Sequence, residues 1–111
     1  MKNSILVQKS KDFSIKIIHL CEKLKGHSVL SKQLLRSGTS IGANIHEAIF
    51  AQGTNDFISK LQIALKECSE SEYWLYLIKE SNIYNVEKEI TDGCVELKKL
   101  LIASINTVKS K

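Results

Sequence analysis

The chain has 111 residues, 43% of them hydrophobic, and a net charge of +4 from 16 basic and 12 acidic side chains. That size suits one domain over residues 1–111, and the modest charge permits a nucleic-acid or acidic partner without demanding one. No apolar run approaches the roughly 20 residues of a membrane span, and the first residues are too short an apolar run for a signal peptide, so we expect a cytoplasmic protein.

Four helices are predicted from the spacing of apolar residues and from the absence of proline. The first is expected from Asn3 or Ser4 to Lys25 with Gly26 as its cap, and the second over residues 28–52. The third is expected over residues 54–82 and the fourth from residue 85 to the end. Connections of about two to four residues make neighbouring helices antiparallel. The expected fold class is therefore an all-α, antiparallel up-down-up-down four-helix bundle.

The second helix carries three stripes when its residues are placed about 100° apart. Its apolar stripe comprises Leu30, Leu34, Ser37, Ile41, Ile45 and Ala48. A stripe lined with small residues, outside the bundle-facing one, comprises Leu35, Gly38, Gly42 and Ile49. An ordinary surface helix has one buried stripe and charged residues on the rest of its surface. The second helix has few charged residues outside its apolar stripe, so we expect it to pack on a further side. In so short a chain, the simplest partner is another copy, which predicts a homo-oligomer with this stripe as a subunit contact. A tight contact within one chain is the alternative use of the two glycines.

The polar stripe of the same helix predicts a structural network. Its members, with two carboxylates of the third helix, are Arg36, Ser40, Asn44, Glu47, Glu67 and Glu72. If the network is buried, removing one partner should cost about 3–5 kcal/mol, because the other charge is left unpaired. Glu72 lies at the edge of an apolar stripe, where a catalytic or ligand-binding carboxylate is the alternative to a structural partner for Arg36, Ser40 or Asn44. The structural role is the favoured one.

Cysteines and histidines do not form a site in the sequence. Cys21, Cys68 and Cys94 are odd in number and lie on apolar stripes, which favours buried free thiols over a metal or redox role. His19, His27 and His46 form no pair with the helical spacing that bundles use for metals. No metal, no cofactor and no small-molecule substrate is expected.

Aromatic and basic side chains are the candidates for nucleic-acid contact. Trp74, Tyr73 and Tyr76 lie on different faces of the third helix, which favours packing or a subunit contact over base stacking. The lysines form no single run, so a solvated surface is the simpler interpretation of each one. Lys98, Lys99, Lys109 and Lys111 of the last helix are the first candidates for phosphate contacts, because adjacent copies could align them.

Two blocks of sequence carry a resemblance to a known family. The first is Arg36-Ser37-Gly38-Thr39-Ser40-Ile41-Gly42-Ala43-Asn44-Ile45, followed by Glu47-Ala48, and the second comprises residues 56–61, 64–67 and 73–75. They resemble the bacterial four-helix-bundle family named after the 23S ribosomal RNA intervening-sequence protein. The resemblance implies a homopentameric ring. A distant similarity to the accessory protein of diversity-generating retroelements, which binds a reverse transcriptase and nucleic acid, implies RNA or DNA as a partner.

The sequence thus favours a non-enzymatic, oligomeric bundle that acts as an RNA-binding or scaffold module. No nucleophile with a neighbouring base and no phosphate-binding loop supports the rival class, a small enzyme or metal carrier. The alternative that remains open is a protein–protein adaptor that binds no nucleic acid. A salt-dependent affinity for nucleic acid would separate the two.

Overall fold

The structure, a computed structural model, describes residues 4–111, and this part of the chain contains four α-helices and no strand. The helices are α1 (Ser4–Glu22), α2 (Ser28–Ile49), α3 (Thr54–Glu80) and α4 (Lys88–Lys109). The predicted all-α class with four helices is therefore confirmed for the described residues. The alternative start of the first helix at Asn3 lies outside them.

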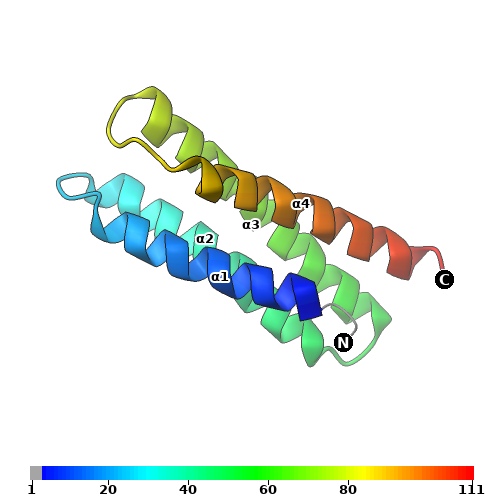
Figure 1. Cartoon of the computed structure of the whole chain (residues 1–111). Helices are drawn as coiled ribbons and strands as arrows, with labels where there is room; N and C mark the ends of the chain where they lie inside the picture. Colours follow the sequence, from blue (N-terminus) through cyan, green and yellow to red (C-terminus); the bar gives the residue numbers. More distant parts are fainter. Residues whose placement is uncertain (1–3) are drawn as a thin grey trace.

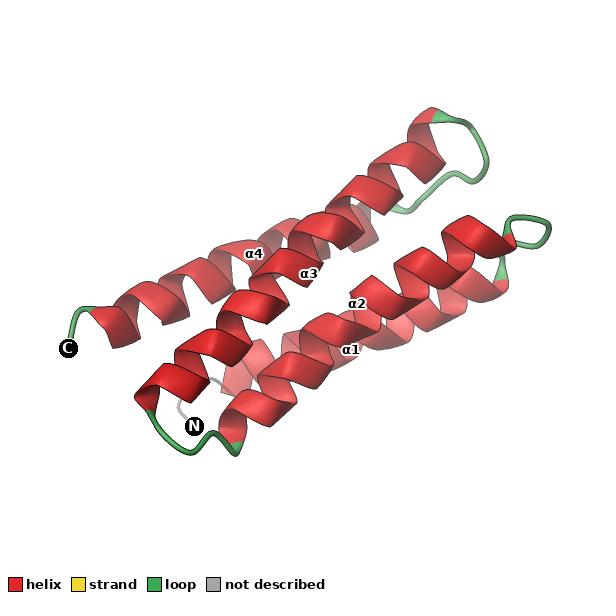
Figure 2. Ribbon diagram, turned by 180° about the vertical axis from the view of Figure 1, so that it is seen from behind, coloured by secondary structure: helices red, strands yellow, loops and turns green. Residues whose placement is uncertain are grey.

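The helices lie side by side in a rod of 46 × 20 × 19 Å. The chain turns back at each of its three connections, so consecutive helices are neighbours (Figures 1 and 2). α1 packs against α2 and α4, and α3 packs against the same two helices. Every described helix therefore has two neighbours and leaves its outer side free.

The core is built from the apolar stripe of each helix. Ile17 of α1, Ile41 of α2 and Leu101 of α4 have no exposed surface, and Leu75 of α3 has 1%. Burying an aliphatic side chain of this size stabilises the fold by about 1.5–3 kcal/mol. The apolar spacing thus predicts the inward face of all four helices correctly.

Helix ends differ from the prediction where an apolar residue is drawn into the core. α1 ends at Glu22 rather than Lys25, because the backbone tightens and the N–H of Leu24 donates to the carbonyl of Cys21 at 3.2 Å. This turn buries Leu24, which is only 4% exposed. Gly26 then takes a φ of +85°, a left-handed conformation that glycine adopts without a steric penalty.

The connection before α4 is longer than predicted and spans residues 81–87. Val86 lies in it and is 4% exposed, so the connection supplies a core residue before the helix begins at Lys88 instead of Asn85. α2 also ends early, at Ile49 instead of Gln52.

Candidate functional site

Gly38 and Gly42 lie where α2 meets α1. A Cβ added at Gly38 would lie 2.9 Å from Cγ2 of Ile17, and one at Gly42 would lie 3.2 Å from Oγ of Ser14. Neither position has room for a larger side chain without movement of α1. The two glycines therefore face α1 and not the outside of the bundle, which is the alternative prediction of a tight contact within one chain.

Leu35 and Ile49, the other members of that stripe, are partly exposed at 38% and 37%. Further large apolar side chains are exposed on the same helix and just after it, with Val29 and Phe50 each at 73%. A subunit contact through Leu35 and Ile49 stays a prediction, and it no longer has the glycines as its basis.

Arg36 of α2 contacts two carboxylates of α3. Its Nη1 donates to Oε2 of Glu67 at 2.9 Å, and its Nη2 donates to Glu70. The indole Nε1 of Trp74 donates to the same oxygen of Glu70 at 2.9 Å. Arg36 and Glu67 thus meet as the sequence predicts, while Glu70 and Trp74 are partners that the polar stripe did not reveal.

The Arg36 cluster lies at the rim of the helix pair rather than inside it. The side chain of Arg36 is 50% exposed, although that of Glu67 is only 13% exposed. The Trp74 hydrogen bond, and then the guanidinium of Arg36, lower the pKa of Glu70 below its usual range. Glu70 is accordingly ionised at neutral pH and serves as an acceptor, which is unsuited to proton donation in catalysis.

The remaining members of the predicted network bind elsewhere. Glu47 pairs with Lys60 at 3.0 Å, Glu72 pairs with Lys98 of α4 at 3.0 Å, and Nδ2 of Asn44 donates to the backbone carbonyl of Ser40 at 2.9 Å. A single buried network on this stripe was the wrong expectation. The charged residues form separate ion pairs with adjacent helices, whereas Asn44 bonds within its own helix.

A buried hydrogen bond holds the centre of the α2–α3 contact. The hydroxyl of Ser71 donates to Oγ of Ser37 at 2.9 Å, and that of Ser37 donates to the carbonyl of Leu34 at 3.4 Å. Both serines have no exposed surface. The position of Ser37 on the apolar stripe of its helix indicated a buried hydroxyl in need of a partner. The sequence did not identify Ser71 of α3 as that partner.

Two of the three cysteines match the expectation of buried free thiols. The sulfurs of Cys68 and Cys94 lie 3.7 Å apart between α3 and α4, and each thiol contacts the backbone carbonyl of the other. The contact between the thiols, together with burial, raises the pKa of Cys94, which keeps it protonated. Cys21 differs, because it is only half-buried and its sulfur contacts the carbonyl of Ser31 at 3.5 Å.

The lysines proposed for phosphate contacts are not equivalent. Lys98 is engaged, since its Nζ donates to Oε1 of Glu72 at 3.0 Å. Lys99 is exposed but lies in a shallow groove with Asp92 and Glu96. The other three of these four candidates are exposed and have no ion pair with any described residue: Lys99, Lys109 and Lys111.

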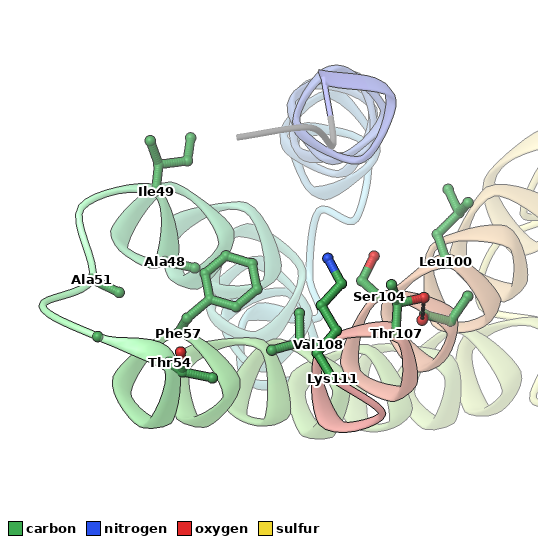
Figure 3. A pocket seen from close by; sticks show the side chains of 12 residues that line it. Ala48, Ile49, Ala51, Thr54, Phe57, Leu100, Ser104, Thr107, Val108 and Lys111 are labelled. Carbon is green, nitrogen blue, oxygen red and sulfur yellow. Dashed lines mark hydrogen bonds between the residues drawn. The ribbon is translucent and has the colours of Figure 1, made fainter.

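An apolar hollow of about 700 Å³ lies between the end of α2, the start of α3 and the end of α4. Figure 3 shows Phe57 projecting into it from α3, opposite Val108 of α4 and Lys111, which follows that helix. Ile49, one of the predicted contact residues, lies at its edge. Its walls gather apolar and hydroxyl side chains with a single lysine, which is not a set of acid–base partners.

The aromatic residues of α3 divide between core and surface. Trp74 is half-buried against the core, whereas Tyr73 and Tyr76 are 55% and 61% exposed. The rings of Tyr73 and Trp74 meet edge to face with centroids 5.3 Å apart. Packing within the chain thus accounts for Trp74 and leaves the tyrosines on the surface.

Residues 4–111 contain neither a cluster of metal ligands nor a membrane-spanning helix. Over that range, no three side chains of His, Cys, Asp or Glu gather closely enough to hold a metal ion. None of the described helices is long and apolar enough to cross a membrane.

Comparisons with known proteins place the chain beside one family. The family model described as 23S rRNA-intervening sequence protein matches residues 2–103. A crystal structure of a protein of unknown function from the S23 ribosomal protein family of Bacteroides thetaiotaomicron is 46% identical, with a TM-score of 0.82. The alignment covers 90% of this chain and 97% of that one. No curated protein matches the chain.

Proposed function

The chain belongs to the 23S rRNA-intervening sequence protein family, and from this premise we propose that it is a non-enzymatic binding module for RNA. In this proposal it is an antiparallel up-down-up-down bundle that acts in the cytoplasm. Copies of it assemble into a closed homo-oligomer, for which the family resemblance implies five subunits. The module binds the phosphate backbone without strong sequence preference.

The observation that carries the RNA proposal is the positive charge left on the surface after ion pairs form. Acidic side chains of neighbouring elements neutralise Lys9, Lys16, Arg36, Lys60 and Lys98. Most of the other described lysines are exposed and have no acidic partner within the described chain. In a ring this surplus is multiplied by the number of copies, and lysines contact phosphates irrespective of base sequence.

Exposed apolar side chains support the assembly. Leu35, Ile49 and Phe50 expose apolar surface on α2 or just after it, and Ile49 also lines the apolar hollow at the end of the rod. Self-association would remove such surface from water, which is favourable by about 25 cal/mol for each Å² of apolar surface buried. A ring would use two different patches on each copy, as closed heterologous assemblies do.

Light scattering after gel filtration tests the assembly. The proposal expects a mass near five times the 12.5 kDa of one chain at micromolar concentration. A Leu35→Glu/Ile49→Glu variant should dissociate, because it buries charge at the proposed contact. A wild type that runs at 12.5 kDa would exclude a stable ring.

Fluorescence anisotropy with a labelled hairpin of 23S ribosomal RNA tests the binding. We expect a weak complex, with a dissociation constant in the range of about 10⁻⁴–10⁻⁶ M at physiological salt, which weakens steeply as salt rises. A protein that causes no anisotropy change at low salt would favour the alternative, an adaptor that binds another protein through its exposed helices.

A further inference from the structure

The net charge of the chain is concentrated in one segment. Residues 23–46 contain Lys23, Lys25, Lys32 and Arg36 and no acidic residue, and the other twelve basic residues are balanced by twelve acidic ones. The whole formal excess of +4 therefore comes from this segment. It forms the connection from α1 to α2 and most of α2.

Within the segment, only the end near the connection leaves its charge available. Arg36 is bound by two carboxylates of α3 and contributes little free positive charge. Lys23, Lys25 and Lys32 are exposed, and none has an ion pair with any residue from 4 to 111. We refer to these three lysines and the turn between them as the basic tip.

The shape of the chain presents the basic tip to the solvent. The turn projects from the end of the rod beside the α3–α4 connection, and the C-terminus of α4 lies at the opposite end (Figures 1 and 2). The first turn of α2 contains no acidic side chain. The acid just before the turn, Glu22, accepts from the ring of His19 at 3.2 Å.

Two carboxylates of the neighbouring connection and of α4 lie beside one lysine of the basic tip. Lys23 borders a small hollow that also contains Glu87 and Glu89, and Glu89 is already paired with Lys16. Lys25 and Lys32 do not border that hollow. Glu87 thus shares a hollow with only one of the three lysines.

Two of the four candidate lysines at the end of the chain, Lys98 and Lys99, have close counter-charges. Lys98 is bound to Glu72, and Lys99 shares its groove with Asp92, Glu96 and Glu89. Residues 87–111 contain four acidic residues and five lysines, so their net charge is only +1. A polyanion would therefore meet a weaker positive potential along α4 than at the basic tip.

We infer that the basic tip, rather than the lysines of α4, is the main contact of this protein with the phosphate backbone of RNA. The inference rests on the proposed RNA binding and adds the location of the contact. Three long, flexible ammonium side chains bind phosphates as point charges, which fits a sequence-independent contact. In a ring, each copy would contribute one such tip.

Three triple variants with the same charge change locate the contact by anisotropy on the 23S ribosomal RNA hairpin. One carries Lys23→Gln, Lys25→Gln and Lys32→Gln, and the second carries Lys99→Gln, Lys109→Gln and Lys111→Gln. The third, a control, replaces exposed lysines of three helices: Lys11→Gln, Lys66→Gln and Lys88→Gln. Circular dichroism melting verifies that each is folded, as expected for exposed side chains.

The tip variant should lose at least about tenfold in affinity at low salt. Its plot of log K against log salt should flatten by about 2–3, because each phosphate contact contributes about 0.7–0.9 to that slope. The other two variants should change less in both readouts. Equal losses in all three, or the largest loss in the α4 variant, would overturn the location while leaving RNA binding intact.

The remaining outcomes separate the inference from the proposal beneath it. If the wild type does not bind the hairpin at all, the proposed function fails and the location fails with it. Poly-glutamate of matched charge is the second probe. If it competes with the hairpin as well as unlabelled RNA does, the tip binds acidic peptide, and RNA is the wrong partner.

Discussion

Helix α2 meets its two neighbours by different means. Toward α1 it presents Gly38 and Gly42, and the two helices approach until an added methyl group would collide with Ile17. Toward α3 it presents a buried serine pair with Arg36 at the rim. The first contact depends on the absence of side chains and the second on hydrogen bonds, so substitutions should affect them with different magnitudes.

The α1 contact should be the more fragile. Gly38→Leu forces a branched side chain against Ile17, whose Cγ2 would already lie 2.9 Å from a Cβ. Overpacking in a well-packed interior costs about 1–3 kcal/mol and occasionally more, and we expect about 3 kcal/mol or more here. Urea denaturation followed by circular dichroism measures it. An unchanged midpoint would mean that α1 moves aside freely.

Alanine at two glycines provides the matched control. Gly38→Ala should destabilise the chain, whereas Gly93→Ala of α4 should stabilise it by about 0.5–1 kcal/mol through helix propensity. The added Cβ at Gly93 would lie 3.7 Å from Cδ1 of Phe13, an ordinary contact. Equal effects at both positions would show that propensity, and not space, decides.

The serine pair should rank second. Ser37→Ala leaves the hydroxyl of Ser71 without its acceptor in a fully buried place, which costs about 1–3 kcal/mol. Ser71→Ala should cost less, because Ser37 still donates to the carbonyl of Leu34. The double variant should be less destabilised than the sum. Additive free energies of unfolding would argue that the two hydroxyls do not interact.

The rim of the same contact should matter less. Arg36→Ala is expected to lower the free energy of unfolding by about 1 kcal/mol, since half of the arginine side chain is exposed and solvent screens its ion pairs. The loss should shrink at high salt. Arg36→Lys, which keeps one charge but not the two-pronged contact, is the control. A cost of about 3–5 kcal/mol would restore the buried network expected from the sequence.

These contrasts mark what helical spacing can and cannot predict. Spacing identified the inward faces of all four helices, because burial depends on the side chain's own angle around its helix. It did not reveal whether Gly38 faces α1 or another copy, because a small residue is compatible with either. Likewise the partner of Glu72 depends on which helix lies beside it. Lys98 of α4 was the answer, and nothing local to α3 pointed to it.

The basic tip is a second example of this limit of sequence analysis. The absence of acids over residues 23–46 is visible in the sequence alone. Only the structure shows which of these charges are available. The charge of Arg36 is neutralised by carboxylates of α3, and the turn near Gly26 lies at the end of the rod. The lysines of the last helix were the first candidates because adjacent copies could align them, and the pairing of Lys98 with Glu72 of α3 becomes apparent only in three dimensions.

The smallest expected effect is the pH dependence of the α2–α3 rim. The hydrogen bond from Trp74, and then Arg36, lower the pKa of Glu70 in the folded chain. A carboxylate whose folded pKa is depressed adds stability that is fully present above its unfolded value of about 4.3, and that stability is lost as the pH falls through the lower folded value. Glu70 is partly exposed, so the contribution should stay below about 1 kcal/mol.

Urea midpoints of the wild type and Glu70→Gln, followed by Trp74 fluorescence, should differ at pH 7 and converge below about pH 4. The glutamine keeps an acceptor for the indole, so it isolates the charge. A difference that persists unchanged at low pH would mean that the carboxylate stabilises the rim by its shape rather than its ionisation.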